Sequence, residues 1–405
     1  MKKNNKKKKW MRPRHRLARN LLNLVLRPYS YAKYGIRVER FCEQGKRPYL
    51  VLFNHQTAFD QFFVGMAFRG PVYYVASEDI FSKGWVSSVI RYLVAPIPIK
   101  KQTTDLRAIL NCIRVAKEGG TIALAPEGNR TYSGKTEYMS DAIAPLARKL
   151  GLPIALYRIE GGYGVHPRWS DVVRKGKMRG YVARVVEPEE YAAMTDAELF
   201  EVIRQTIYVN EANTEHVYRH KRLAEYLERA MYVCPDCGLS TFESNKDIIS
   251  CKRCKKQIRY TDRTELVGVN CTFPYRFASD WYDAQADFVN ALALDAYKEV
   301  PMYIETVEFS RVIPYVKKES ICKSADISLW GDRITVKTDD ALLEFPFDSL
   351  FGVTVLGKNK LNLYHGDTIY QIKGSPRFNA LKYVHIYHRY KNICKGDQHA
   401  KFLGL

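Results

Sequence analysis

A histidine and an aspartate five positions apart, His55 and Asp60, are the first residues whose types and spacing suggest chemistry. They belong to the run 54–60, which directly follows an apolar stretch. A neutral imidazole can accept a hydroxyl proton near pH 7, and a carboxylate on its other ring nitrogen fixes the tautomer and stabilises the imidazolium. The pair can assist attack by an alcohol if His55 lies in a turn and Asp60 in the helix that starts there. On spacing alone, a helix-capping or solvated pair is the better interpretation.

A second group of polar residues follows the apolar stretch 121–125. Pro126 and Gly128 impose a turn at the end of this stretch. Arg130 supplies a planar fork that can bind a phosphate through two hydrogen bonds. Glu127 can bind substrate hydroxyls or orient the basic groups.

Two lysines, Lys100 and Lys101, follow the short apolar segment 96–99 between these two groups. Open α/β sheets bind ligands where their strands end. Two cationic segments and a histidine–aspartate pair, all at the ends of apolar stretches, therefore suit a substrate with both a phosphate and a free hydroxyl.

The elements that must position these residues alternate between strand-like and helical stretches over about 190 residues. This alternation predicts an α/β domain with a largely buried sheet flanked by helices. The expected strands are 49–53, 72–76, 97–99, 121–125 and 153–159, and the clearest helices are 106–117 and 139–150.

The ordered motifs HxxxxD, a basic residue after an Ile-Pro-Ile strand, and PEGxR resemble the glycerolipid acyltransferase family, typified by 1-acylglycerol-3-phosphate acyltransferases. The resemblance covers roughly residues 30–210 and implies the acyltransferase-type mixed sheet. It implies direct attack by the acceptor hydroxyl, with no covalent acyl-enzyme and no metal in the reaction. His55 would be the general base and Asp60 its orienting partner. The substrate-binding residues would be Lys100, Lys101, Glu127, Gly128, Asn129 and Arg130.

The sequence departs from the family pattern at several positions. Lys101 stands where the family usually has arginine, and Lys100 stands where it has an acidic or small residue. Lysine neutralises a phosphate but lacks the planar fork of arginine, so the acceptor geometry can differ. Leu156 replaces the second proline after Pro153, and residues 138–141 replace the usual Phe-Lys-x-Gly segment.

Four cysteines form two CxxC pairs separated by thirteen residues. Four thiolates at this spacing are typical of a tetrahedral structural zinc site, and the segment resembles a zinc ribbon. Two disulfides or a redox pair are alternatives, disfavoured because no clean secretory signal is evident and five further cysteines are present. The predicted ligands are Cys234, Cys237, Cys251 and Cys254.

The chain is strongly basic, with 64 Lys and Arg against 43 Asp and Glu and a formal net charge of +21. This imbalance favours a polyanionic partner, such as nucleic acid, an anionic membrane or a phosphorylated substrate. Behind the lysine run 2–9, leucines and arginines over 10–27 predict a basic amphipathic helix that anchors the protein on a membrane surface. A first helix packed on the domain is the alternative. The sequence contains no uninterrupted run of about 18 apolar residues, so a transmembrane helix is not predicted.

Composition and periodicity, together with the acyltransferase and zinc-ribbon resemblances, predict seven segments. His216 and His220, four positions apart in the predicted linking helix, are interpreted as part of a solvated face rather than a metal site. The C-terminal strands loosely resemble a pleckstrin-homology-like domain. The segments are a basic tail and membrane-anchoring helix (1–30), an acyltransferase domain (31–210), a linking helix (211–231), a zinc ribbon (232–262), a connector (263–300), a β-rich domain (301–392) and a tail (393–405).

The resemblance implies an O-acyltransferase of phospholipid biosynthesis that uses acyl-CoA or acyl carrier protein to convert 1-acylglycerol-3-phosphate into phosphatidic acid. Another lysophospholipid or glycerol-3-phosphate is an alternative acceptor. A non-catalytic lipid binder and a basic zinc-ribbon protein that binds nucleic acid are alternatives from other classes, but the latter leaves the two motifs unexplained. We expect a cytoplasmic enzyme, peripheral on the inner face of an anionic membrane, with a lysophospholipid and an acyl donor as partners.

Overall fold

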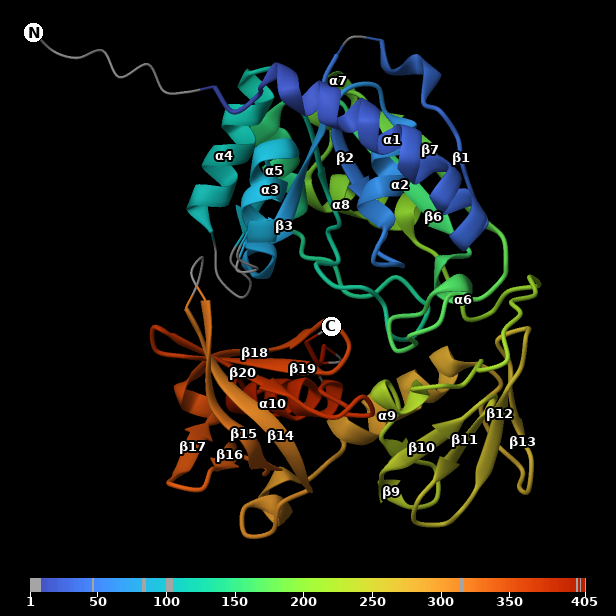
Figure 1. Ribbon diagram of the computed structural model, residues 1–405, viewed down its shortest axis with the longest axis vertical. Helices are drawn as coiled ribbons and strands as arrows, with labels where there is room; N and C mark the ends of the chain where they lie inside the picture. Colours follow the sequence, from blue (N-terminus) through green and yellow to red (C-terminus); the bar gives the residue numbers. More distant parts are fainter. Residues whose placement is uncertain are drawn as a thin grey trace, which may run out of the picture. The chain divides into compact units, whose positions relative to one another are not determined.

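The computed structural model describes most of the chain (Figure 1). Lys100 and Lys101 lie outside the described residues, as does most of the basic run at the N-terminus. The chain divides into two compact units, the first made of residues 1–130, 139–161 and 177–209 and the second of 131–138, 162–176 and 210–405. The described residues are 9–45, 47–81, 85–99, 105–313, 317–397, 400 and 402–404.

The first unit is built on a seven-stranded sheet in the order β1-β7-β6-β2-β5-β3-β4. Neighbouring strands are parallel except for the antiparallel pair β6 and β7, which confirms the expected mixed sheet. All four residues of β2 are buried, as is usual for a central strand covered on both faces. The strands are β1 (Ile36–Val38), β2 (Leu50–Phe53), β3 (Val72–Ser77), β4 (Ile97–Ile99), β5 (Thr121–Leu124), β6 (Ile154–Glu160) and β7 (Met178–Val186).

Helices cover the sheet of the first unit. The helix expected after Trp10 is present and extends to Tyr34, and in Figure 1 it lies across α2. Asp105 caps α4 by accepting hydrogen bonds from the backbone N–H groups of Arg107 and Ala108. The helices are α1 (Pro13–Tyr34), α2 (Asp60–Ala67), α3 (Trp85–Leu93), α4 (Leu106–Lys117), α5 (Ile143–Leu150), α7 (Pro188–Ala192) and α8 (Asp196–Ile207). In the described part of the chain, no helix combines the length and the apolar character needed to cross a bilayer.

The second unit contains the four cysteines in a small β structure. The strands β8 (Val233–Cys234) and β9 (Gly238–Leu239) form a hairpin beside an antiparallel sheet in the order β10-β11-β12-β13. The rings of Phe242 and Phe273 pack edge-on against Trp281 of the following helix α9. The remaining elements of this part are α6 (Gly162–Val165), β10 (Phe242–Asn245), β11 (Ile248–Cys251), β12 (Gln257–Tyr260), β13 (Leu266–Gly268) and α9 (Ala278–Asn290).

The C-terminal part of the second unit is a seven-stranded antiparallel half-barrel, which confirms the expected β-rich domain. Its order is β17-β16-β15-β14-β20-β19-β18, and α10 closes it through a hydrogen bond from the Tyr387 hydroxyl to Leu350 O. The pleckstrin-homology-like interpretation stays a prediction, which this strand order and the terminal helix support. The elements are β14 (Tyr303–Ile313), β15 (Lys317–Leu329), β16 (Arg333–Lys337), β17 (Leu342–Pro346), β18 (Leu350–Leu356), β19 (Lys360–His365), β20 (Thr368–Lys373) and α10 (Leu381–Cys394).

The predicted linking helix 211–231 is wrong, and so is the helical placement of His216 and His220. Helix α8 ends at Ile207, and over residues 208–231 the only helical element is the short turn η3 (Leu227–Arg229). The other short turns of the described chain are η1 (Cys42–Gln44), η2 (Glu78–Phe81), η4 (Leu294–Tyr297) and η5 (Phe347–Ser349).

Tertiary hydrogen bonds and packing explain why this segment is not helical. The Glu211 N–H donates to Gly134 O at 2.7 Å, and Arg219 exchanges backbone hydrogen bonds with Lys175. The buried Tyr218 ring lies so close to Gly164 that a Cβ on that glycine would stand 2.1 Å from the ring. Backbone groups that would close helical turns are therefore bonded to other segments of the second unit.

Candidate active site

The structure brings His55 and Asp60 together at the carboxyl end of β2. His55 lies in the turn after the strand, and Asp60 is the first residue of α2. His55 Nδ1 stands 2.8 Å from Asp60 Oδ2. The Asp60 side chain is fully buried, whereas the His55 side chain is 25% exposed. The imidazole therefore remains accessible while its partner is shielded from water.

Backbone and hydroxyl donors hold the Asp60 carboxylate in place. Oδ2 accepts from Gln56 N at 2.6 Å, and Oδ1 accepts from the Thr57 hydroxyl at 2.6 Å and from Thr57 N at 2.9 Å. The N-terminal end of α2 also favours a negative charge at this position. A carboxylate held in this way requires the proton on His55 Nδ1, which leaves the lone pair of the neutral ring on Nε2. The Asp60 carboxylate thus has two roles: it holds the turn through the backbone N–H groups of Gln56 and Thr57, and it orients the imidazole of His55.

The loop after β5 reaches the same point because β5 is the parallel neighbour of β2. Leu124 at the end of β5 is in register with Leu52 of β2, so the two following loops are adjacent. The expected turn is present, since the Gly128 N–H donates to Ala125 O. Gly128 has φ of 68°, a left-handed conformation that favours glycine.

Glu127 joins the two loops. Its side chain is buried, and Oε1 accepts a hydrogen bond from the backbone N–H of His55 at 2.7 Å. Sequence reasoning assigned Glu127 to substrate hydroxyls or to the orientation of basic groups. The hydrogen bond adds a contact with the main chain of His55, and the predicted role in substrate binding stays a prediction.

Replacing Glu127 with glutamine is expected to lower kcat about tenfold, because hydrogen bonds to charged groups contribute about 1.5–3 kcal/mol and part of that contribution holds His55 in place. Initial rates at saturating acceptor and donor measure the effect. An unchanged kcat with a raised KM would instead indicate that Glu127 binds the substrate directly.

Arg130 ends this loop near a tyrosine that sequence reasoning missed, Tyr34. Burial raises the pKa of the Tyr34 hydroxyl, and the positive charge of Arg130 acts in the opposite direction. The Tyr34 ring packs against Phe59 at 5.1 Å and Phe63 at 5.7 Å between ring centroids. The negative charge of Asp60 raises the pKa of the same hydroxyl. Asn129 is partly exposed beside Arg130.

Asn54 starts the candidate run 54–60, but sequence reasoning gave it no role of its own. Its buried amide donates to Ile159 O at 2.8 Å and accepts from Ile159 N at 2.7 Å. These bonds tie the end of β2 to β6. A polar residue that directly follows a buried strand was the available signal for this role.

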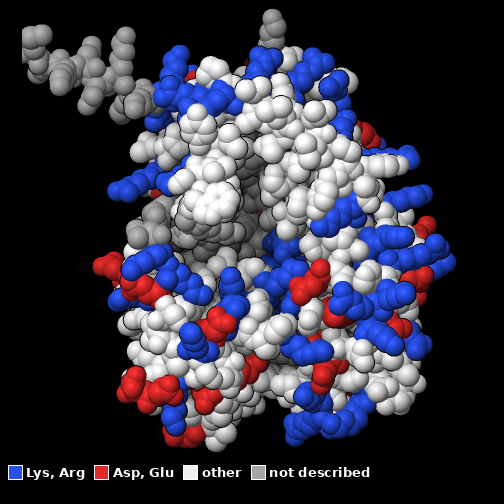
Figure 2. Space-filling view, viewed as in Figure 1, with Lys and Arg blue, Asp and Glu red and all other residues white. Residues whose placement is uncertain are grey.

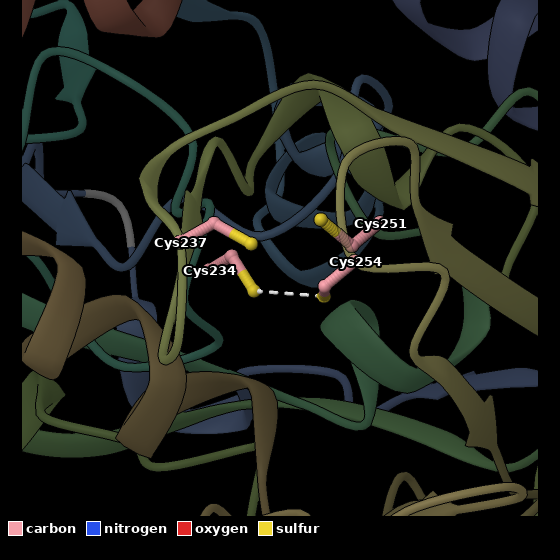
Figure 3. A group of neighbouring side chains, drawn as sticks. All are labelled: Cys234, Cys237, Cys251 and Cys254. Atoms are coloured by element: carbon pink, nitrogen blue, oxygen red, sulfur yellow. Dashed lines mark hydrogen bonds between the residues drawn. The ribbon is translucent and has the colours of Figure 1, made fainter.

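The four cysteines of the second unit converge in Figure 3, where their sulfur atoms point toward one another. The Sγ atoms lie within 4.8 Å of one another, and those of Cys234 and Cys254 are 3.7 Å apart. Four sulfurs bound to one zinc at about 2.3 Å stand about 3.8 Å from each other, so the cluster fits a tetrahedral zinc ion. All nine cysteines are free thiols, so no disulfide joins any two of the four.

Hydrogen bonds also prepare Cys251 for a metal. Burial alone would raise the pKa of the Cys251 thiol, but hydrogen bonds from the Ser240 hydroxyl and from the backbone lower it to about 7. Zinc binds the thiolate form of cysteine. Cys234 and Cys251 are buried and Cys254 is exposed, so the cluster lies at the edge of the small β structure.

Comparisons with known proteins give one family match and one similar solved structure. Residues 34–159 match the family model described as Acyltransferase, a range that contains the histidine–aspartate pair and the loop 126–130. Among solved structures, the fold is similar to the 1-acyl-sn-glycerophosphate (LPA) acyltransferase PlsC from Thermotoga maritima, with 22% identity and a TM-score of 0.40 over 49% of this chain and 80% of that chain. No match was found among curated proteins. The family match over residues 34–159 supports the acyltransferase resemblance of the motifs in that range.

Proposed function

We propose that the protein transfers a fatty acyl group from acyl-CoA or acyl carrier protein to the free hydroxyl of 1-acylglycerol-3-phosphate and so forms phosphatidic acid. The observation that carries the proposal is the 2.8 Å contact between His55 Nδ1 and Asp60 Oδ2 at the end of β2, within the acyltransferase domain. The buried Glu127 carboxylate adds support, because it holds the main chain of the proposed base.

In the proposed reaction, His55 Nε2 takes the proton of the acceptor hydroxyl as its oxygen attacks the thioester carbonyl carbon. The tetrahedral intermediate collapses, the carbon–sulfur bond breaks, and the imidazolium returns the proton to the leaving thiolate. The net reaction gives an ester and a thiol. Asp60 stabilises the transient imidazolium and keeps Nε2 directed toward the acceptor.

The acceptor phosphate needs a cation close to the base. We assign this cation to Arg130, because it ends the loop that Glu127 joins to the main chain of His55. Its planar guanidinium can bind two phosphate oxygens at once. Lys100, Lys101, Gly128 and Asn129 complete the proposed acceptor site.

A membrane location is supported by the surface of α1. Arginines alternate with leucines along this helix, and an interfacial helix combines such an apolar face with basic residues. Figure 2 shows uncharged areas bordered by Lys and Arg over the helices of the first unit. We propose that the enzyme is cytoplasmic and lies on the inner face of an anionic membrane. The side chains on the apolar face of α1 that are 59–76% exposed are Leu17, Leu21, Leu24 and Val25.

An assay with vesicles tests the proposed reaction. Purified protein is incubated with vesicles, radiolabelled 1-acylglycerol-3-phosphate and either acyl-CoA or acyl carrier protein loaded with a fatty acid. Formation of labelled phosphatidic acid with one of the donors is the expected result. If both donors leave the label unchanged while the protein binds the vesicles, the assay is repeated with glycerol-3-phosphate and with other lysophospholipids. Failure with all acceptors would refute the enzymatic proposal.

A further inference from the structure

A pocket of about 430 Å³ opens in the first unit beside α1 and the C-terminal end of α2. Three guanidinium groups and two amides line it, and none of its described lining residues is acidic. Met66 is the residue of α2 that lines the pocket, and it follows Asp60 by six positions, which is about 9 Å along the helix axis, so the pocket is separate from the proposed catalytic pair. The lining residues are Arg19, Asn20, Asn23, Leu24, Arg27, Pro28, Arg40 and Met66.

Two of the arginines are held in place by the end of α2. Arg19 donates to Gly65 O at 3.3 Å and to Phe68 O, and Arg27 donates to Met66 O at 3.1 Å. Carbonyl groups at a helix C-terminus carry only partial negative charge. These hydrogen bonds to carbonyl groups therefore orient both guanidinium groups without neutralising their positive charge.

The arginines also act on one another. Burial lowers the pKa of the Arg19 guanidinium, and the positive charges of Arg40 and Arg27 lower it further. The carboxylate next to Arg40 in the sequence, Glu39, is paired with Arg179 at 2.5 Å. The pocket thus gathers positive charge and hydrogen-bond donors, an arrangement that fits an anion with several oxygens, such as a phosphate.

The surroundings of the pocket decide between a soluble phosphate and a lipid phosphate. Leu24 lines the pocket and also belongs to the exposed apolar face of α1. Leu21 and Val25 continue that face on the next positions of the helix. A phospholipid at a bilayer surface presents its phosphate beside its acyl chains, which can contact the apolar side chains next to the pocket. A soluble phosphate has no apolar part to make such contacts.

We propose that this three-arginine pocket binds the phosphate of an anionic membrane phospholipid and thereby fixes how the first unit lies on the bilayer. The proposal rests on the membrane location in the proposed function but adds a lipid site distinct from the acceptor site. It makes binding depend on the headgroup at a defined place, rather than only on the total positive charge of the chain.

The test compares Arg40→Glu with Lys149→Glu in the full chain. Arg40 is exposed, and the hydrogen bonds to the carbonyl groups of α2 come from Arg19 and Arg27. Both sets of hydrogen bonds therefore remain in Arg40→Glu. Lys149 is exposed on α5 outside the pocket and undergoes the same change of charge. Binding is measured by flotation with vesicles of phosphatidylcholine containing phosphatidylglycerol, and with phosphatidylcholine alone. Melting temperatures verify that each variant folds.

We expect Arg40→Glu to weaken binding to the phosphatidylglycerol vesicles about tenfold or more, and Lys149→Glu about threefold or less. Arg40→Gln should change binding in the same direction by a smaller factor. Equal binding by the two glutamate variants would overturn the proposal. A soluble-phosphate site would also overturn it, and would be recognised if inorganic phosphate stabilises wild type but not Arg40→Glu while vesicle binding of the two is equal.

Failure of the proposed function is recognised separately from failure of the pocket. Wild-type turnover of a dissolved short-chain lysophospholipid, without vesicles, reports on the chemistry alone. Arg40-dependent vesicle binding without any turnover would support the pocket and remove the enzymatic proposal. Turnover together with vesicle binding that does not depend on Arg40 would support the enzymatic proposal and remove the proposed lipid pocket.

Discussion

Replacing His55 with alanine is expected to reduce the rate of acyl transfer about 10²–10⁴-fold, the range over which positioned general bases accelerate reactions. The variant leaves the acceptor hydroxyl without a group to take its proton. Its fold should be preserved, because the His55 side chain is 25% exposed, whereas its partner Asp60 is fully buried. Initial rates of product formation under saturating substrates measure the loss, and melting temperatures verify the fold.

A double-mutant comparison tests whether the two residues act as one unit. Asp60→Asn keeps the size of the side chain but offers an amide where the backbone N–H groups of Gln56 and Thr57 need an acceptor, so the tautomer and orientation of the imidazole are lost. Residues that act together are strongly non-additive, so the double variant should be no slower than His55→Ala alone. A further loss in the double variant would mean that Asp60 acts independently of the imidazole.

A second histidine serves as a control, because the loss of activity in His55→Ala must differ from the general effect of removing an imidazole. His216 is exposed in the second unit, and His216→Ala should retain the wild-type rate. If both alanine variants lost activity to the same extent, the assignment of the base would be wrong.

The position of the catalytic loops could be predicted from the sequence because strand ends are local features. Two apolar stretches each run directly into a polar motif, and parallel strands place such ends at one edge of a sheet. The pairing of β2 with β5 then places the loop that contains Glu127 beside His55. The partner of Glu127 could not be predicted, since a carboxylate can accept from any nearby donor and only the register fixes which one it meets.

Other parts of the fold depend on contacts between distant segments. The sequence over 211–231 is charged and favours a helix locally, yet the close packing of Tyr218 against Gly164 accompanies an irregular path of bends and turns. Tertiary contacts of this kind override local propensity and have no pattern that can be read from one sequence. Tyr34 was missed for a similar reason, because its burial depends on Phe59 and Phe63 of another element.

The half-barrel illustrates an intermediate case. The alternation of apolar and polar residues predicts strands at 327–330, 333–337, 342–345, 352–356, 361–364 and 368–372, and the last five lie close to the observed bounds of β16 to β20, whereas β14 was not predicted. Strand β15 (Lys317–Leu329) was predicted only over its last residues, because its first half carries mostly exposed, polar side chains. An exposed half-strand gives no alternation of burial, so the pattern that identifies a strand is absent there.

Removing the predicted zinc ligand Cys251 is expected to have the second large effect, on stability rather than on chemistry. Wild type should bind one zinc ion per chain, and Cys251→Ser should bind it far more weakly. Structural zinc contributes about 10–16 kcal/mol to the folding of small zinc-finger peptides. The larger aromatic core around Trp281 retains part of the structure, so we expect the melting temperature to fall by about 10 °C.

Cys271→Ser is the matched control for the cysteine cluster. Cys271 is a free thiol in the same part of the second unit, and it does not belong to the group of four whose sulfur atoms lie within 4.8 Å. This variant should keep both the zinc content and the melting temperature of wild type. Metal analysis after gel filtration and thermal unfolding with and without a chelator provide the measurements. Equal zinc content in the two serine variants would contradict the assignment.

The Cys251→Ser variant also distinguishes a structural zinc from a catalytic one. Four sulfur ligands leave no open coordination position, so the metal has no site at which to bind a substrate oxygen. Below the melting transition of Cys251→Ser, turnover of a dissolved acceptor should therefore stay within about twofold of wild type, whereas the melting temperature falls. A loss of turnover at temperatures where the variant is still folded would assign the zinc a part in the reaction. Since His55 and Asp60 belong to the first unit and the cysteines to the second, we expect zinc loss to affect stability first.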